Sequence, residues 1–376
     1  AAKADSVQQL RPNVVLIMME SMSAEFMKHF GQSETLTPFL DSLYTRSISF
    51  RNFYSAGIHT NHGLYATLYS FPAMMKRNLM KGSVIPRYSG LPTVLKENGY
   101  YNLFFMTHEG QYDNMNAFFR TNGYDEVFSQ EDYPADKVVN SFGVQDDFLY
   151  DYAIPVLNQR AATGQPFFAT LLSISNHPPY VIPPFFHPKT SEPETQIVEY
   201  ADWALRQFFE EARKQPWFDN TIFVLEGDHG KLVGDAECEL PESYNHIPLM
   251  IYSSRIQPEE KTTFGGQVDI QPTILGLLNI DYLQNNFGVD LLKEERPCMF
   301  YTADNMVVGR NDTLLYLYNY ETQQELTYDI GNGKLNAVPM DDSFLPLKEY
   351  SFSMLQSAEF LVKHGKTLNS IPFTQQ

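Results

Sequence analysis

The sequence predicts an α/β fold with a mainly parallel sheet covered by helices on both faces, followed by a small antiparallel β unit. Runs of strand-forming residues alternate with amphipathic segments over residues 12–296, which is the pattern of βαβ units. Several runs, including "NVVLIMM" at 13–19, are apolar at every position but the first, as in strands buried on both faces. After about residue 297 the chain changes to short strand-like runs separated by turns, which favours antiparallel hairpins. We therefore expect two domains, at 12–296 and 297–376.

Helices are expected where apolar residues recur at helical spacing. In chain order they are expected at 37–46, 91–100, 198–215 and 268–278, with a terminal amphipathic helix at 344–364. The first is marked by Thr37 as N-cap and by Pro38 at the first helical position. Gly99 closes the second helix. Pro272 falls in the first turn of the fourth, where a proline is tolerated.

Strands are expected at the β-branched and aromatic runs between these helices. In the larger domain they are expected at 13–20, 47–56, 101–107, 165–175, 221–225 and 247–254. In the smaller unit they are expected at 298–304, 305–312, 313–321 and 325–331.

Composition limits the classes of function. A hydrophobic content of 43% with 19% charged residues is typical of a globular protein and not of a disordered one. The net charge of −18 argues against a nucleic-acid partner, which needs a basic surface. Cys238 and Cys298 are too few for a disulfide framework, and one bridge or two unrelated thiols both fit the sequence.

Membrane and targeting signals are not visible in the sequence. No run reaches the roughly 18–20 apolar residues of a membrane span. The chain begins "AAKADS" without Met, and we expect a mature or trimmed chain from which a targeting or anchoring segment has been removed.

Charged and imidazole side chains follow three predicted strands. Glu20 ends the first strand, His177 follows the strand at 165–175, and Asp228 and His229 follow the strand at 221–225. Because the carboxyl ends of parallel strands form the usual site edge of an α/β sheet, these residues are candidates for one site. For Glu20 the alternative is a residue that starts a surface loop, and for His177 it is a structural histidine.

Thr60 lies where a glycine-containing loop, "GIHTNHG", enters a predicted helix. Free N–H groups at a helix start bind anions, and a metal ion could lower the pKa of the hydroxyl enough to make it a nucleophile. The alternative is a plain N-cap threonine. Asn61 and His62 make this loop unusually polar for a cap, and we expect them to contact the substrate. His246, at the start of the strand at 247–254, either reaches the same crevice or is an ordinary polar residue.

Glutamate, threonine hydroxyl, aspartate and histidine together suit a divalent metal. A set of three oxygen ligands and one nitrogen, without sulfur, favours Mn²⁺, with Mg²⁺ or Zn²⁺ as alternatives. The chemistry indicated is displacement at a phosphoryl or sulfuryl centre. Thr60 would be the nucleophile, and a histidine would protonate the leaving group.

The order of several motifs carries a resemblance to a known family. In sequence order they are "NVVLIMMES", "TPFLDSL", "FRNFY", the Thr60 loop, "TLLSISNHPPY", "VLEGDHG", "NHIPLMIY" and "VDIQPTILGLL". This order resembles the sulfatase-fold enzymes of the alkaline phosphatase superfamily. Within that group the chain looks most like the extracellular domain of lipoteichoic acid synthases and related phosphoglycerol transferases, over roughly residues 12–291.

The resemblance implies roles for particular residues. Glu20, Thr60, Asp228 and His229 would be the metal ligands, with Thr60 also the nucleophile. His177 would contact the substrate or transfer a proton, and His246 would be a second such residue.

The resemblance also implies substrates and a location. The donor would be a phospholipid head group, and the acceptor a glycan or polyol phosphate. An N-terminal membrane anchor would hold the catalytic domain on the extracytoplasmic side.

The chain departs from the family pattern in two places. The family synthases have a "GKTS"-like loop where this chain has "GIHTNHG". They also have an arginine that contacts glycerol phosphate, whereas the stretch at 109–128 has no arginine before Arg120. The head group transferred could therefore differ from glycerol phosphate.

Alternatives within and outside the fold remain at this stage. The nearest is a phosphoethanolamine transferase, and a phosphodiesterase would differ only in passing the group to water. A sulfatase would need a formylglycine precursor in C/S-x-P-x-R, which neither cysteine supplies and which "SFPAM" from Ser70 lacks because it has no arginine. A non-catalytic protein that has kept the fold would be expected to have lost ligands.

Overall fold

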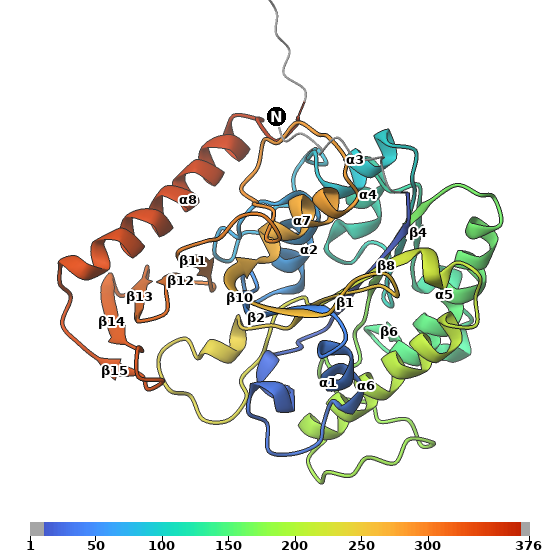
Figure 1. Cartoon of the computed structure of the whole chain (residues 1–376), viewed down its shortest axis with the longest axis horizontal. Helices are drawn as coiled ribbons and strands as arrows, with labels where there is room; N and C mark the ends of the chain where they lie inside the picture. The colour runs from blue at the N-terminus through green and yellow to red at the C-terminus, as the bar shows by residue number, and fades with distance from the viewer. Residues whose placement is uncertain (1–10, 370–376) are drawn as a thin grey trace, which may run out of the picture.

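A computed structural model describes residues 11–369 and shows an α/β body beside a smaller β sheet (Figure 1). The main sheet has eight strands in the order β10-β2-β9-β8-β1-β7-β3-β4. Their bounds are β1 Asn13–Met19, β2 Ile48–Tyr54, β3 Tyr101–Phe105, β4 Glu126–Phe128, β7 Phe167–Leu172, β8 Thr221–Gly227, β9 Leu249–Tyr252 and β10 Glu259–Gly266. The central strand β1 is parallel to both neighbours, β7 and β8.

Apolar side chains on both faces of the sheet explain why helices cover it on both sides. Along β1, Val14 and Leu16 belong to one buried cluster, whereas Val15 and Ile17 belong to another. The first face is covered by α2 Thr60–Tyr69, α3 Leu91–Glu97, α4 Met115–Thr121 and α7 Ile270–Leu277. The second is covered by α1 Pro38–Tyr44, α5 Asp146–Ala161 and α6 Pro193–Ala212. The fold class predicted from the sequence is thus confirmed.

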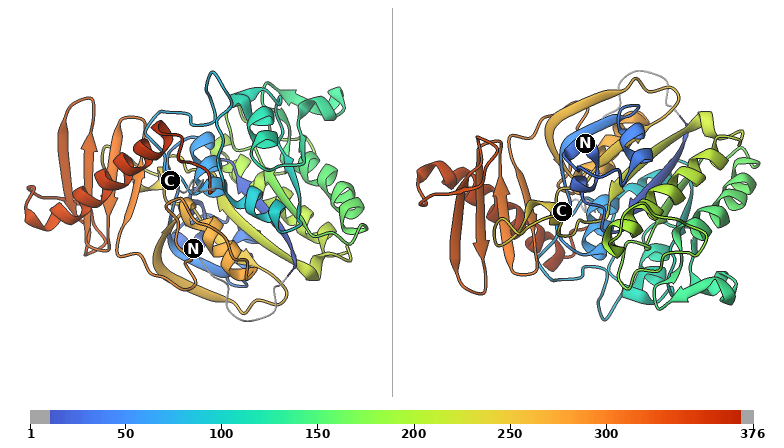
Figure 2. Two further views of the ribbon diagram at one scale, coloured as in Figure 1. Left: turned by 90° about the horizontal axis from the view of Figure 1, so that it is seen from above. Right: turned by 90° about the horizontal axis from the view of Figure 1, so that it is seen from below.

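The C-terminal part is an antiparallel sheet with a long helix across it (Figure 2). Its strands are β11 Met299–Thr302, β12 Met306–Arg310, β13 Leu314–Asn319, β14 Gln324–Asp329 and β15 Asn336–Ala337, and the helix is α8 Leu345–Lys363. Tyr54 and Phe264 of the main sheet pack in one cluster with Met299 and Tyr301 of the smaller one. Because the two sheets share a core, the division into domains at 12–296 and 297–376 stays a prediction.

The structure differs from the sequence prediction in a few elements. Strand β9 is antiparallel to both of its neighbours, so the sheet is mixed. Helices α4 and α5 were not predicted, and Pro155 inside α5 interrupts its helical pattern. The small hairpin β5 Val138–Asn140 with β6 Gly143–Val144 was not predicted either.

Two further features concern membrane-spanning helices and the two cysteines. Within residues 11–369, no helix combines the length and apolar character needed to cross a membrane. Cys238 and Cys298 are both free thiols.

Candidate metal and phosphoryl-transfer site

The predicted residues meet at the carboxyl ends of β1 and β8. Glu20 directly follows β1 and Asp228 directly follows β8, and these two strands run parallel in register up to Met19 and Gly227. Helix α2 begins at Thr60 above the same edge. The topology therefore brings together residues that lie up to about two hundred positions apart in the sequence.

Glu20, Asp228 and His229 form a compact group of ligands. One potential ligand atom from each residue lies within 4.8 Å of the other two. His229 Nε2 is 3.6 Å from Glu20 Oε1 and 3.7 Å from Asp228 Oδ2. Among the described residues, this is the one cluster of at least three such side chains with that spacing.

The chemistry of this group fits a divalent cation. Glu20 and Asp228 are almost fully buried, at 1% and 0% exposure, and Asp228 Oδ2 has no hydrogen-bond partner. His229 Nδ1 lies 2.8 Å from Gly230 O and therefore donates to it, which leaves Nε2 as a free electron-pair donor toward the carboxylates. Burial and then the charge of Asp228 raise the pKa of Glu20 well above its usual value, a cost that a bound cation would remove.

The remaining oxygens of these carboxylates are held by short protein contacts. Asp228 Oδ1 accepts hydrogen bonds from Ser21 N at 2.8 Å and His229 N at 2.7 Å. Ser21 Oγ donates to Glu20 Oε1 at 2.6 Å. The ligands are thus fixed before any ion binds, as metal sites with supporting hydrogen bonds require.

Thr60, the predicted nucleophile, lies at the start of α2 beside Glu20. Its Oγ1 donates to Glu20 Oε2 over 3.4 Å. The first backbone donors inside α2 are His62 and Gly63, both to His59 O, so the N–H groups of Thr60 and Asn61 precede the intrahelical ladder. Such free N–H groups at a helix start favour an anion beside the hydroxyl.

Gly63 allows α2 to pack closely against the backbone of Asp228. A Cβ on Gly63 would lie 2.2 Å from Asp228 O, so a larger residue would push α2 away from the ligands. Gln267 Nε2 holds the same carbonyl over 2.8 Å.

His177 lies on the loop that follows β7. Its Nδ1 is 2.6 Å from Pro178 O and donates to it, which leaves Nε2 free to exchange a proton. Its ring packs against Phe142 of the β5–β6 hairpin, with centroids 4.0 Å apart. The preceding residue, Asn176, bonds directly to the backbone of Glu20.

The other predicted substrate contacts, His246 and Asn61, differ in whether their polar atoms already have hydrogen-bond partners in the protein. His246 is buried, with Nδ1 2.8 Å from Glu25 Oε1 and Nε2 2.8 Å from Arg51 O, so both ring nitrogens have protein partners. Asn61 has a buried Oδ1 without a partner. Substrate contact by His246 and Asn61 stays a prediction.

His62 is fully buried next to the nucleophile loop. Neither of its ring nitrogens makes a hydrogen bond of ordinary geometry within the described chain. Burial, with His59 and His229 nearby, lowers its pKa to about 3, although the backbone of Arg77 opposes the shift. The ring is therefore neutral at physiological pH, and its contact with substrate also stays a prediction.

Sequence reasoning missed three residues around the candidate ligands. Ser21 bonds to Glu20 and Asp228, Asn176 bonds to the backbone of Glu20, and Lys231 bonds to Asn176. Ser21, Asn176 and Lys231 adjoin Glu20, His177 and Gly230 in the sequence. Their position next to predicted site residues or to Gly230 was the available signal. Position in the sequence alone does not show which of the adjacent side chains point toward the site.

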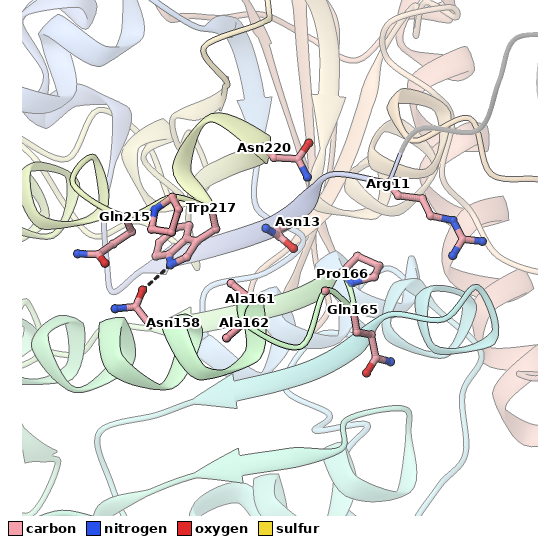
Figure 3. A pocket seen from close by; sticks show the side chains of 12 residues that line it. Arg11, Asn13, Asn158, Ala161, Ala162, Gln165, Pro166, Gln215, Trp217 and Asn220 are labelled. Carbon is pink, nitrogen blue, oxygen red and sulfur yellow. Dashed lines mark hydrogen bonds between the residues drawn. The ribbon is translucent and has the colours of Figure 1, made fainter.

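A hollow with a mixed polar and apolar lining lies at the opposite edge of the sheet (Figure 3). Its volume is about 590 Å³, and it is lined at the amino ends of β1, β7 and β8. Trp217 Nε1 donates to Asn158 Oδ1 over 2.6 Å there. It contains none of the predicted site residues.

Comparison with known proteins places the chain in a family. A model of the sulfatase family matches residues 12–280, more than two thirds of the chain. The chain belongs to the sulfatase family. It is 25% identical over 350 residues to lipoteichoic acid synthase 1 of Bacillus subtilis strain 168, which covers 86% of this chain and 53% of that protein. It is 23% identical over 327 residues to the lipoteichoic acid synthase of Staphylococcus aureus strain USA300, covering 76% and 48%.

Solved structures support the same placement of this sulfatase-family chain. A protein in the alkaline phosphatase superfamily from Vibrio parahaemolyticus superposes with a TM-score of 0.87 at 27% identity, covering 97% of this chain and 90% of that one. The lipoteichoic acid synthase LtaP from Listeria monocytogenes superposes with a TM-score of 0.81 at 21% identity, covering 96% of each, which shows a shared fold. The chain spans about half the length of the curated relatives it matches.

Proposed function

We propose that this protein is a metal-dependent transferase that moves a phosphoglycerol-type head group from a phospholipid to a glycan or glycerol-phosphate acceptor. The observation that carries the proposal is the Thr60 hydroxyl at the start of α2, 3.4 Å from a carboxylate oxygen of Glu20. Glu20 in turn lies in a three-residue group suited to a divalent metal. Similarity to lipoteichoic acid synthases supports the class of donor and acceptor.

The reaction would proceed in two displacements at phosphorus. In the first, Thr60 Oγ1 forms a bond to the phosphorus of the donor, and the bond to the diacylglycerol oxygen breaks. His177 Nε2 gives a proton to that oxygen, and the hydroxyl proton of Thr60 passes to Glu20 Oε2, its hydrogen-bond acceptor. In the second, an acceptor hydroxyl attacks the phosphorus and loses its proton to His177, while Thr60 leaves and recovers its own proton.

Glu20, Thr60, Asp228 and His229 would hold the metal. When bound, a divalent ion supplies charge that stabilises the phosphoryl oxygens and lowers the pKa of the threonine hydroxyl. Manganese suits this oxygen-rich set, with magnesium or zinc as alternatives. Free N–H groups at the start of α2 would bind the anionic head group from the other side.

The position of Thr60 also bears on sulfatase chemistry. Ser70, the nearest candidate for a formylglycine precursor, is the C-cap of α2. It lies ten positions after Thr60, which is about 15 Å along the helix axis. The ligand group therefore lies beside a threonine, and this favours phosphoryl transfer over formylglycine-dependent sulfate hydrolysis.

The proposed location follows from the donor. A phospholipid head group is presented at a membrane surface, and the relatives are about twice as long as the matched segment. We propose that a membrane anchor outside this sequence holds the domain on the extracytoplasmic side of the cell membrane.

The deciding experiment is mass spectrometry of the Thr60 peptide after incubation with Mn²⁺ and a phosphatidylglycerol analogue. We expect a glycerophosphoryl adduct on wild-type protein and none on Thr60→Ala. Thr67→Ala is a matched control, because Thr67 lies on the same helix and binds Glu226 instead of the metal group. It should keep the adduct.

Other outcomes would redirect the assignment. An adduct formed only from phosphatidylethanolamine would identify a phosphoethanolamine transferase. Release of free glycerol phosphate in step with donor loss would identify a phosphodiesterase. An adduct that persists in Thr60→Ala would remove Thr60 as the nucleophile.

A further inference from the structure

Lys231 is a partly buried cation that the proposed reaction does not use. It follows the Asp228-His229-Gly230 turn, and its side chain lies among aromatic rings. Its Nζ is 5.3 Å from the ring centroid of Phe26 and 4.8 Å from that of Tyr180. It donates to Tyr180 Oη over 3.1 Å and to Asn176 Oδ1 over 2.5 Å. A lysine placed in this way has little freedom to act as a solvent-exposed charge.

Asn176 links Lys231 to the backbone next to the metal group. Its side chain is 1% exposed, and its Nδ2 donates to Glu20 O and to Ser21 O, each over 3.1 Å. An amide has one acceptor and two donors, and the acceptor here is occupied by an ammonium group, which can only donate. Lys231 therefore fixes the orientation in which both amide protons face the backbone of the Glu20 turn.

The backbone held by Asn176 is a strained one. Ser21 has φ of 50°, in the left-handed region that residues with a side chain rarely adopt. Such a conformation costs on the order of 1 kcal/mol and persists where its surroundings hold it. Asn176 holds the carbonyl of Ser21 from one side, and Asp228 holds its N–H from the other. This turn sets the direction in which the Glu20 carboxylate points.

We propose that Lys231 is a positioning residue of the metal site, acting through the Asn176 amide to hold the Ser21 turn and so the Glu20 carboxylate in place for the ion. Loss of the ammonium group frees the amide to rotate. One rotamer then presents Asn176 Oδ1 to two carbonyl oxygens, which repels them. The proposal rests on the metal site of the proposed function but not on which head group is transferred.

The test is calorimetric titration of purified, metal-free protein with MnCl₂. Lys231→Met keeps the length and the packing between the rings but removes all donors. It should raise the Kd for Mn²⁺ about 10-fold or more, the usual range for loss of a residue that orients a metal ligand. Lys231→Arg keeps donors and charge and should stay within about 3-fold of wild type, well below that range.

Two further variants separate positioning from a general effect. Asn176→Asp keeps an acceptor for Lys231 but loses both donors to the Glu20 turn, and it should weaken Mn²⁺ binding at least as much as Lys231→Met. Lys214→Met removes an exposed lysine in the turn after α6, paired with Glu211, and should leave Mn²⁺ binding unchanged. Thermal unfolding of each metal-free variant checks that it is folded. If Lys231→Met does not fold, Lys231→Leu replaces it, because leucine also lacks a side-chain donor.

The outcomes distinguish this inference from the proposed function. Wild-type affinity in Lys231→Met or in Asn176→Asp would overturn the positioning role while leaving the metal site intact. Absence of Mn²⁺ binding by wild-type protein would overturn both. Tight binding with no threonine adduct would keep the positioning role and count against the transferase.

Discussion

Two carboxylates buried side by side define the site at the scale of single residues. Glu20 and Asp228 are excluded from water. Donors occupy one oxygen of Asp228 and both oxygens of Glu20, where Thr60 Oγ1 bonds to Oε2. Two adjacent negative charges without a counterion oppose each other, which is why the pKa of Glu20 is raised by burial and then by Asp228. This repulsion lowers the free energy of unfolding of the metal-free protein. The same arrangement leaves the site ready to bind a cation.

Asp228→Asn should have opposite effects on Mn²⁺ binding and on the stability of the metal-free protein. The amide Oδ1 can still accept from Ser21 N and His229 N, while the repulsion on Glu20 disappears. We expect the free energy of unfolding of the metal-free protein to rise, because the neutral amide no longer opposes the charge of the buried Glu20 carboxylate. Addition of Mn²⁺ should stabilise wild type and not the variant. Urea denaturation with and without Mn²⁺ measures both effects, and a variant less stable than wild type without metal would contradict this account.

At the scale of elements, helix α1 is capped by another helix. Thr37 occupies its N-cap position but makes no capping bond to it. Asp202 of α6 instead accepts from Phe39 N and Leu40 N, both at 2.9 Å. Its side chain is 2% exposed, so it also fixes the packing of α1 on α6. A capping group supplied by another element couples the formation of the two helices.

Asp202→Ala should destabilise the protein by about 2 kcal/mol, since it leaves two buried helix-start N–H groups without an acceptor. The matched control is Glu210→Ala on the same helix, which removes an exposed pair with Arg206 and should cost less than about 0.5 kcal/mol. Chemical denaturation measures both. Equal losses in the two variants would show that Asp202 does not cap α1.

At the scale of the whole molecule, the C-terminal sheet reaches the nucleophile loop. His59, directly before Thr60, has its Nε2 2.6 Å from Oδ1 of Asp304 in the β11–β12 turn. A second connection joins Arg310 of β12 to Glu242, with the guanidinium 5.0 Å above the ring of Tyr54. The small sheet thus contacts the start of α2 as well as the loop that follows the ligands.

Asp304→Ala should lower kcat by about 3–10-fold with little change in stability. The His59 pair is half-exposed, so it contributes less than about 1 kcal/mol to folding, but it orients the residue next to the nucleophile, where small displacements are costly. Steady-state kinetics and urea denaturation test the two parts. Glu325→Ala, which breaks a pair with Lys348 inside the C-terminal unit, is the control and should leave kcat unchanged. A kcat for Asp304→Ala equal to that of this control would contradict the coupling.

The sequence alone determined the architecture because its signals are local. The apolar run of β1, Pro38 at the start of α1 and Gly99, with φ of 85° after α3, each act within a few residues. The candidate ligands Glu20 and Asp228 were singled out from the sequence because a charged residue that ends a buried strand is costly without a partner, and their binding of a metal stays a prediction. The direction of β9 could not be predicted, because an apolar strand has the same sequence pattern whether it pairs parallel or antiparallel with its neighbours.

Tertiary structure decided which polar residues support the site. Lys231, Asn176 and Ser21 meet only because β1, β7 and β8 end at one edge, and their contacts join positions about 55 to 155 apart. Asp269 lies at the start of a predicted helix, and in the structure it is fully buried and paired with Arg296, 27 residues away. Local patterns determine where strands and helices form. The partner of a buried charge depends on which chain segments pack against it, and only the folded chain specifies that.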